Sequence, residues 1–323
     1  MAGSSRWLRR LAPWVIAAVV IGLLVWRYSP RAIAIELARG EVLAVIPWVV
    51  AVSLSALVLM ATADWLVFSA ALGRHLRLFD VARGRAATSI LAALHFGLSS
   101  GGYAVWLARR TGVGAGAAVG AAGYQLLSDL GAVCLCALPA ALLGASLLPA
   151  RVGDTSALVA AMGLVGVPLL LVVAPRAAPR RWRETRLLVA WARVPVTVWV
   201  ATTLPRAGTI AINIAGTWAA ARAFGLTLPF EALAAGLPII YLVGSLPVNV
   251  LGLGAVQAAW LALFDRHAPG AQILAFQFAY QLLGVLMMVL RGLPFLPGVM
   301  RDLERAPEPR GSAHSHRRIN SPP

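Results

Sequence analysis

The sequence is short of charge. Charged residues make up 12% of its 323 residues and hydrophobic residues 60%, and it contains no lysine. A soluble domain carries about one quarter charged residues. The composition therefore excludes an ordinary soluble enzyme or binding module, and it predicts an all-α polytopic membrane protein.

Patterns that bind metals or support catalysis are also missing. Cys134 and Cys136 are the only cysteines, and residues two apart on a helix point to different faces, which excludes a disulfide between them. The five histidines have no metal-ligand spacing, and no Ser/His arrangement or paired catalytic carboxylates occur at fixed spacing. We therefore expect no metal, no cofactor and no enzymatic activity, and an intramembrane transferase is the least favoured alternative.

Long apolar runs fill most of the chain. A spanning helix needs about 20 apolar residues, and the sequence predicts six full transmembrane helices within a single integral membrane domain over residues 1–300, in halves 1–150 and 151–300. The tail 301–323, rich in arginine, proline and serine, is expected to be disordered and cytoplasmic. The six predicted spans are Leu11–Trp26, Leu43–Leu72, Ala115–Leu148, Ala157–Ala174, Pro195–Phe224 and Ile273–Pro297.

Two shorter apolar segments, Ala86–Leu107 and Phe230–Phe264, are each interrupted by glycine and small polar residues. Each interruption is followed by the triplet Trp-Leu-Ala, which begins at Trp106 and at Trp260. Backbone that leaves the helix inside a bilayer survives only where protein buries it or a wet cavity meets it. Two such breaks, one in each half, are typical of transporters built from inverted repeats.

The arginines orient these segments. If the N-terminus is cytoplasmic, 21 of the 28 arginines fall in cytoplasmic segments and six fall outside, with Arg206 inside a span. This bias follows the positive-inside rule, so the net charge of +16 needs no nucleic-acid partner. It predicts a bacterial cytoplasmic (inner) membrane protein with both termini in the cytoplasm.

The arginines also predict two re-entrant hairpins. Basic residues flank the first interrupted segment on both sides, so we expect it to enter from the cytoplasm, turn near Ser99–Gly102 and return. The second is expected to enter from outside and turn near Pro247–Gly254. Each half then has two spans, a hairpin and one span, and the two halves form an inverted repeat.

Three segments resemble a known family: Ser99–Gly102 leading to Arg109–Val113, Ser128–Leu130, and Leu246-Pro247 followed by Gly252–Gln257. Over roughly Leu43–Pro297 the chain resembles the lysylphosphatidylglycerol synthase transmembrane-region family, the flippase-like domain without its synthase. The resemblance implies an eight-segment lipid-translocase fold. Gln257 stands where the family usually has an acid, and Gln125 stands where members often have a glutamate.

Polar residues at membrane depth are the candidate binding residues, because an ionisable group there costs at least about 2.5–3.5 kcal/mol and usually faces a cavity or a partner. Acids suit a cationic headgroup or a proton relay, and the arginine fork suits a phosphate. Packing between helices explains the small residues equally well. The candidates are Asp129, Asp64, Arg206, Gln125, Gln257, Asn249, Ser99, Ser100, Gly101, Gly102, Gly252 and Gly254.

These features predict a translocase of a lipid or lipid-linked headgroup that alternates access around the two broken-helix hairpins. Its partners would be membrane lipids, above all an anionic phospholipid or a lipid-linked headgroup. Two alternatives stay open: a small-solute secondary transporter, and an accessory membrane subunit of an envelope lipid or glycan pathway.

Overall fold

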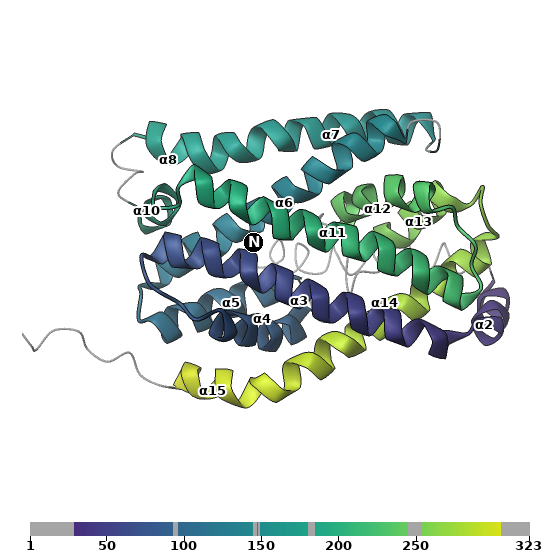
Figure 1. Ribbon diagram of the computed structural model, residues 1–323, viewed down its shortest axis with the longest axis horizontal. Coiled ribbons are helices and arrows are strands. Elements are labelled where there is room, and N and C mark those ends of the chain that lie inside the picture. Colours follow the sequence, from purple (N-terminus) through teal and green to yellow (C-terminus); the bar gives the residue numbers. More distant parts are fainter. Residues whose placement is uncertain are drawn as a thin grey trace, which may run out of the picture.

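The computed structural model describes residues 29–92, 96–144, 147, 149–179, 185–244 and 254–304. Every regular element in these ranges is helical (Figure 1). The first half contains α2 (Pro30–Arg39), α3 (Val42–Leu72), α4 (Leu78–Ala92), α5 (Phe96–Thr111) and α6 (Ala115–Leu143). The second contains α7 (Ala150–Pro168), α8 (Ala174–Ala177), α10 (Arg186–Ala192), α11 (Val196–Phe224), α12 (Phe230–Gly244), α13 (Ala255–Phe264), α14 (Gly270–Gly292) and α15 (Leu296–Glu304).

Four helical segments are long and apolar enough to cross a membrane: Val42–Leu72, Ala115–Leu143, Gly153–Ala177 and Gly270–Glu304. The third joins α7 to α8 through the π-helical turn Leu169–Val173, and the fourth joins α14 to α15 through the 3-10 turn Leu293–Phe295. They coincide with four of the six predicted spans and confirm an all-α, membrane-embedded protein.

The other two predicted spans are not among these four segments. The segment Pro195–Phe224 forms the 29-residue helix α11, but it is not one of the four, since its threonines, Asn213 and Arg206 lower its hydropathy. The segment Leu11–Trp26 lies outside the described residues. Of the predicted tail, residues 301–304 belong to α15.

The outer faces of the long helices are apolar and exposed. Leu54 and Val58 on α3, Leu142 and Leu143 on α6, and Leu204 on α11 expose between 48% and 85% of their surface. A soluble protein rarely leaves so many large apolar side chains uncovered. Lipid is the solvent that such a surface fits.

Helices α3 and α11 lie side by side and run in opposite directions at the centre of the bundle (Figure 1). Gly216 faces Val52 near one end of this contact, and Gly208 faces Leu59 further along. As the residue number rises on α3 it falls on α11, which is the mark of an antiparallel pair. Small residues let the two backbones approach closely, as in other membrane helix pairs.

The helices of the two halves correspond in order and length. Shifted by 154 residues, α3 becomes 196–226, and α11 spans Val196–Phe224. The same shift brings both ends of α4 within two residues of α12, starts α6 one residue before α14, and superimposes the two Trp-Leu-Ala triplets. Helices α3 and α11 also end alike, at glycines with positive φ, 59° at Gly73 and 90° at Gly225. The two halves therefore show the same order of about five helical elements, as proteins built from internal repeats do.

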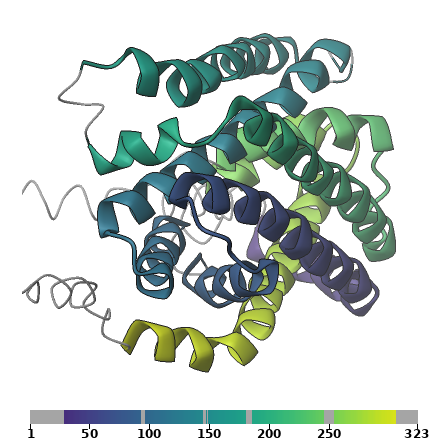
Figure 2. The same ribbon diagram turned by 60° about the vertical axis from the view of Figure 1, so that its left-hand side comes forward.

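Each interrupted segment forms two short helices. The pair α4–α5 and the pair α12–α13 lie toward opposite ends of the molecule in both views (Figures 1 and 2). The predicted turn of the first pair was wrong, because Ser99–Gly102 lies within α5. Helix α4 ends at Ala92 and α5 begins at Phe96, and residues 93–95 lie outside the described residues. Glycine serves packing here, since a Cβ on Gly102 would meet Leu91 of α4 at 2.7 Å.

The turn of the second pair was predicted near Pro247–Gly254. Helix α12 ends at Gly244, residues 245–253 lie outside the described residues, and Gly254 is the N-cap of α13. Gly254 has φ 105°, a conformation that L side chains rarely adopt.

The two ends of the bundle differ in charge. The end at which α3, α5, α8 and α15 finish, here called the basic end, has nine arginines and three carboxylates among the described residues. The opposite end has five of each. The basic end comprises Arg74, Arg77, Arg83, Arg109, Arg110, Arg176, Arg186, Arg193 and Arg301 with Asp80, Asp302 and Glu304.

The α3–α11 contact predicts a difference between two glycines. A Cβ on Gly216 would lie 2.0 Å from Cγ2 of Val52, whereas one on Gly208 would lie 3.5 Å from Cδ1 of Leu59. Gly216→Ala should therefore destabilise the protein by about 1–3 kcal/mol through overpacking, and Val52→Ala should restore much of the loss in the double variant. Thermal unfolding in detergent measures both.

Gly208→Ala is the matched control for this experiment. It makes the same substitution on the same helix and at the same interface, so the gain in helix propensity from glycine to alanine is equal in the two variants. We expect Gly208→Ala to unfold at or slightly above the wild-type temperature. Equal unfolding temperatures for the two alanine variants would contradict this packing.

Candidate functional site

Arg206 enters the bundle from the middle of α11. Pro205 precedes it and cannot donate a backbone hydrogen bond, which weakens the helix at this turn. Three threonine hydroxyls donate to nearby carbonyls, Thr202 and Thr203 to Trp199 and Thr209 to Pro205, at 2.8–3.0 Å. The helix is continuous through the proline, and Arg206 points inward, where 2% of its side chain is exposed.

Arg206 belongs to a set of four ionised side chains from four helices, here called the central charge cluster: Asp64, Arg85, Asp129 and Arg206. Nη2 of Arg206 lies 3.7 Å from Oδ1 of Asp64 on α3, and Nη1 pairs with Oδ1 of Asp129 on α6. Arg85 of α4 pairs with the other oxygen of Asp64. Positive and negative charges alternate, so the cluster is electrically neutral as a whole.

Burial differs along the cluster. Asp64 exposes 0% of its side chain and Arg206 2%, while Asp129 exposes 19% and Arg85 23%. Gln125, one turn before Asp129 on α6, donates a hydrogen bond to the carboxylate of Asp129. In this conformation the inner pair is buried, and the two outer groups are partly exposed.

The cluster lies well inside the bundle. Arg206 is the eleventh residue of α11 and Asp129 the fifteenth of α6, so at a rise of 1.5 Å they lie about 15 and 21 Å from the basic end. A hydrocarbon core is about 30 Å thick. At this depth isolated charges are expensive, and mutual pairing explains how these four persist.

Hydrogen-bonding capacity is left over at Arg206. A guanidinium has five N–H donors, and within the ranges that the structure describes its buried Nε has no hydrogen-bond partner. The 3.7 Å contact with Asp64 is an ion pair but too long for a hydrogen bond. An anion with several acceptor oxygens could use these donors.

Sequence reasoning identified four of these five residues and missed one. Asp64, Asp129, Arg206 and Gln125 were predicted as binding residues, and the structure brings them together. Arg85 was counted only as a topological charge. It could have been found, because Arg83 and Arg85 are two residues apart and so point to different faces of α4.

Arg291 on α14 also turns toward the bundle. Its Nη1 donates to the carbonyl oxygen of Ser53 at 2.6 Å and to the Ser53 hydroxyl at 2.9 Å. This contact ties α14 of the second half to α3 of the first. The pair of Arg206 and Asp129 ties α11 of the second half to α6 of the first in a similar way.

Gln257 lies in a different network. Its Oε1 accepts from the backbone N–H of Gly254 at 2.5 Å, and its Nε2 donates to Gln277 of α14 at 2.8 Å. Both glutamines are buried. Gln257 thus caps α13 and fixes it to α14. These two structural contacts explain why a neutral polar residue is buried here, without a role in binding.

The remaining predicted residues are not part of the cluster. Ser99, Ser100, Gly101 and Gly102 occupy the first turns of α5, where a Cβ on Gly101 would meet nothing within 4 Å. Asn249 and Gly252 lie outside the described residues. Among the residues that the structure does describe, no three His, Cys, Asp or Glu side chains gather into a set that could hold a metal ion.

Comparison of the chain with protein-family models found no match, and comparison with curated proteins found none either. The geometry of the site therefore has to carry the argument about function.

The charge cluster predicts that Arg206 is essential to stability. Arg206→Gln leaves Asp64 buried with one partner fewer and Asp129 without its cation, and removal of one member of a buried pair costs about 3–5 kcal/mol. We expect a large drop in the unfolding temperature. Adding Asp129→Asn should recover part of it, because the second change removes the unpaired charge.

Arg222→Gln provides the control for that measurement. Arg222 lies on the same helix, but its side chain is exposed near the opposite end, with its Cζ 5.1 Å from the ring centroid of Trp218. This variant should unfold within a few degrees of the wild type. If Arg206→Gln behaved like Arg222→Gln, the cluster would not be a buried ionic network.

Proposed function

We propose that this protein translocates a lipid or lipid-linked headgroup across the membrane. One observation carries the proposal: a neutral set of two arginines and two aspartates is buried where two repeated halves meet around an antiparallel helix pair. Transporters built from repeats hold their substrate site at such a junction, with broken helices beside it.

The chemistry of the cluster suits a headgroup. Arg206 is buried in this conformation, and opening of the bundle beside it would offer its spare donors to a phosphate, whose oxygens accept hydrogen bonds from the planar guanidinium. Asp129 is partly exposed and suits a cationic group or a proton. A headgroup that binds Arg206 competes with the two aspartates for the same cation. Binding would loosen the contact between α11 and the first half, and this gives the substrate a differential interaction with two conformations.

The proposed membrane orientation rests on the basic end. Nine arginines against three carboxylates indicate the cytoplasmic side by the positive-inside rule. The pair α4–α5 then enters from the cytoplasm and returns, and α12–α13 does the same from outside. In this arrangement the halves are inverted with respect to the membrane, and both termini of this bacterial inner-membrane protein are cytoplasmic. The resemblance to the lysylphosphatidylglycerol synthase transmembrane region supports the same architecture.

Thiol labelling tests the re-entrant pairs. In a background without Cys134 and Cys136, single substitutions His75→Cys and Arg109→Cys flank the first pair, and Thr227→Cys and Arg266→Cys flank the second; all four positions are exposed. An impermeant thiol reagent should label the first two from the cytoplasmic face only and the last two from the outer face only. Flanks of one pair that react from opposite faces would mean that the pair crosses the membrane completely.

Translocation is tested in proteoliposomes that contain fluorescent phospholipids, with a quencher added to one side. The wild type should expose inner-leaflet label to the quencher, and Asp129→Asn should slow this at least about tenfold by removing an accessible charge of the cluster. Asp154→Asn is the control, because Asp154 is an exposed carboxylate near the start of α7. No protein-dependent translocation with any of several headgroups would reject the proposal for those lipids and favour a small-solute carrier or an accessory subunit.

A further inference from the structure

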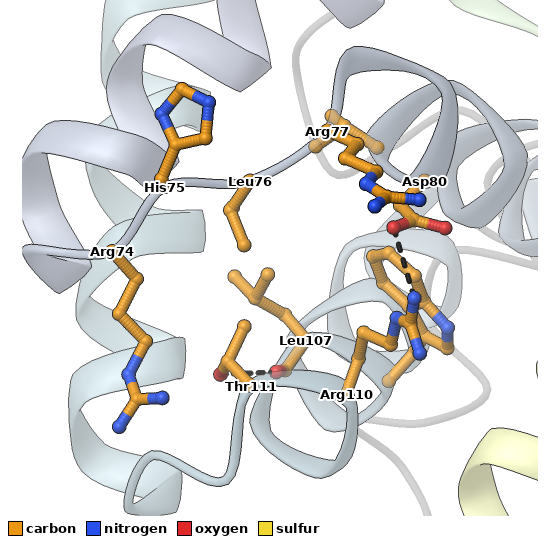
Figure 3. A pocket seen from close by; sticks show the side chains of 10 residues that line it. Arg74, His75, Leu76, Arg77, Asp80, Leu107, Arg110 and Thr111 are labelled. Carbon is orange, nitrogen blue, oxygen red and sulfur yellow. Dashed lines mark hydrogen bonds and ion pairs between the residues drawn. The ribbon is translucent and has the colours of Figure 1, made fainter.

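A hollow of about 240 Å³ opens at the basic end, between the loop after α3 and the helix α5 (Figure 3). Leu76 and Leu107 meet in its middle. Arg74 lies on one side of them, and Arg77 and Arg110 lie on the other. The lining thus combines an apolar centre with cations at its margins, and it is distinct from the central charge cluster.

The cations of this hollow outnumber their counter-charges. Asp80 is the one carboxylate among the lining residues. It accepts a hydrogen bond from Arg110 at 2.9 Å and lies 3.8 Å from Arg83. That hydrogen bond raises the pKa of Arg110. In the described part of the chain no carboxylate pairs with Arg74 or Arg77, so a ligand anion has two arginines available.

The shape of the lining distinguishes between anions. Inorganic phosphate would use the arginines but would gain nothing from Leu76 and Leu107. An amphiphile uses both, because its phosphate meets the cations while its glycerol and first methylenes cover the leucines. The hollow also lies at the end of the bundle where a leaflet's headgroups would be.

The hollow points toward the central charge cluster along one helix face. Val81 of α4 lines it. Arg85 follows Val81 by four residues, so it lies on the same face of α4, about 5.4 Å or one turn deeper. Arg85 is therefore the cation of the cluster that lies one turn of α4 from the lining of the hollow.

We propose that this hollow binds the phosphate-bearing headgroup of an anionic phospholipid from the leaflet at the basic end, with Arg74 and Arg77 supplying the charge. The proposal rests on the proposed function in one respect: it makes the hollow the place where the headgroup waits before it reaches the cluster. Binding itself can be measured without any translocation.

The experiment titrates purified full-length protein in neutral detergent with phosphatidylglycerol or phosphatidylcholine and counts bound lipids by native mass spectrometry. The wild type should bind phosphatidylglycerol at least about tenfold more tightly than phosphatidylcholine. The double variant Arg74→Gln, Arg77→Gln should lose at least about tenfold in affinity for phosphatidylglycerol, since hydrogen bonds to charged groups are the strong ones. Thermal unfolding verifies that each variant is folded.

Arg109→Gln is the matched control. Arg109 is exposed at the same end, next to Arg110, and does not line the hollow. It should change the affinity less than about twofold if the hollow is a site rather than part of a diffuse basic surface. Equal losses in Arg109→Gln and the double variant would overturn the proposal. If glycerol phosphate displaced phosphatidylglycerol at equal concentration, the proposal that the ligand is a lipid would be rejected.

The same variants separate this proposal from the proposed function. If the wild type binds phosphatidylglycerol through Arg74 and Arg77 but translocates no lipid in proteoliposomes, the hollow stands and the translocase fails. If the wild type translocates lipid and the double variant binds and translocates like it, the translocase stands and the hollow fails. Loss of binding together with slower translocation supports both.

Discussion

An arginine surrounded by helices that face lipid is the constraint on which the rest of this structure depends. Arg206 exposes 2% of its side chain and Asp64 none, in a bundle whose outer face is apolar. Neither charge could stay at that depth alone, since a solitary buried ion costs several kcal/mol after relaxation. Their pairing fixes how far α3 and α11 slide past each other, because a shift of one turn would separate the two groups by about 5.4 Å.

The other two charges extend this constraint to the neighbouring helices. Asp129 gives Arg206 a second carboxylate and so holds α6 to α11, and Arg85 gives Asp64 its second cation and holds α4 to α3. Close apolar packing, as between Gly216 and Val52, sets how near the helices approach but tolerates sliding. The ionic contacts specify one arrangement among those that packing allows.

The sequence predicts the helices of this protein better than it predicts their contacts. Long apolar runs gave the spans, because the bilayer demands a minimum length of apolar helix. The glycine-rich segments predicted the two interrupted helix pairs, but the first turn was wrongly placed at Ser99–Gly102. In a sequence, a glycine that ends a helix cannot be told from a glycine that lets α5 pack closely against α4. Asp64, Asp129 and Arg206 were found because charge at membrane depth is costly wherever it occurs. Arg85 follows Arg83 closely in sequence and was grouped with the topological arginines, and its partner on α3 could not be deduced from a linear pattern.

The repeat is symmetric in its helices and asymmetric in its charges, and this asymmetry bears on mechanism. The positions related by 154 residues to Asp64, Arg85, Asp129 and Arg206 hold Trp218, Ile239, Leu283 and Val52. The central charge cluster therefore has no charged counterpart at these related positions. The corresponding part of the bundle is closely packed around Phe264 and Phe276 and contains the neutral buried pair Gln257 and Gln277. In the proposed translocase, a headgroup would find no second charged set at the positions related by the shift of 154 residues. Alternating access would then need the cluster itself to change partners.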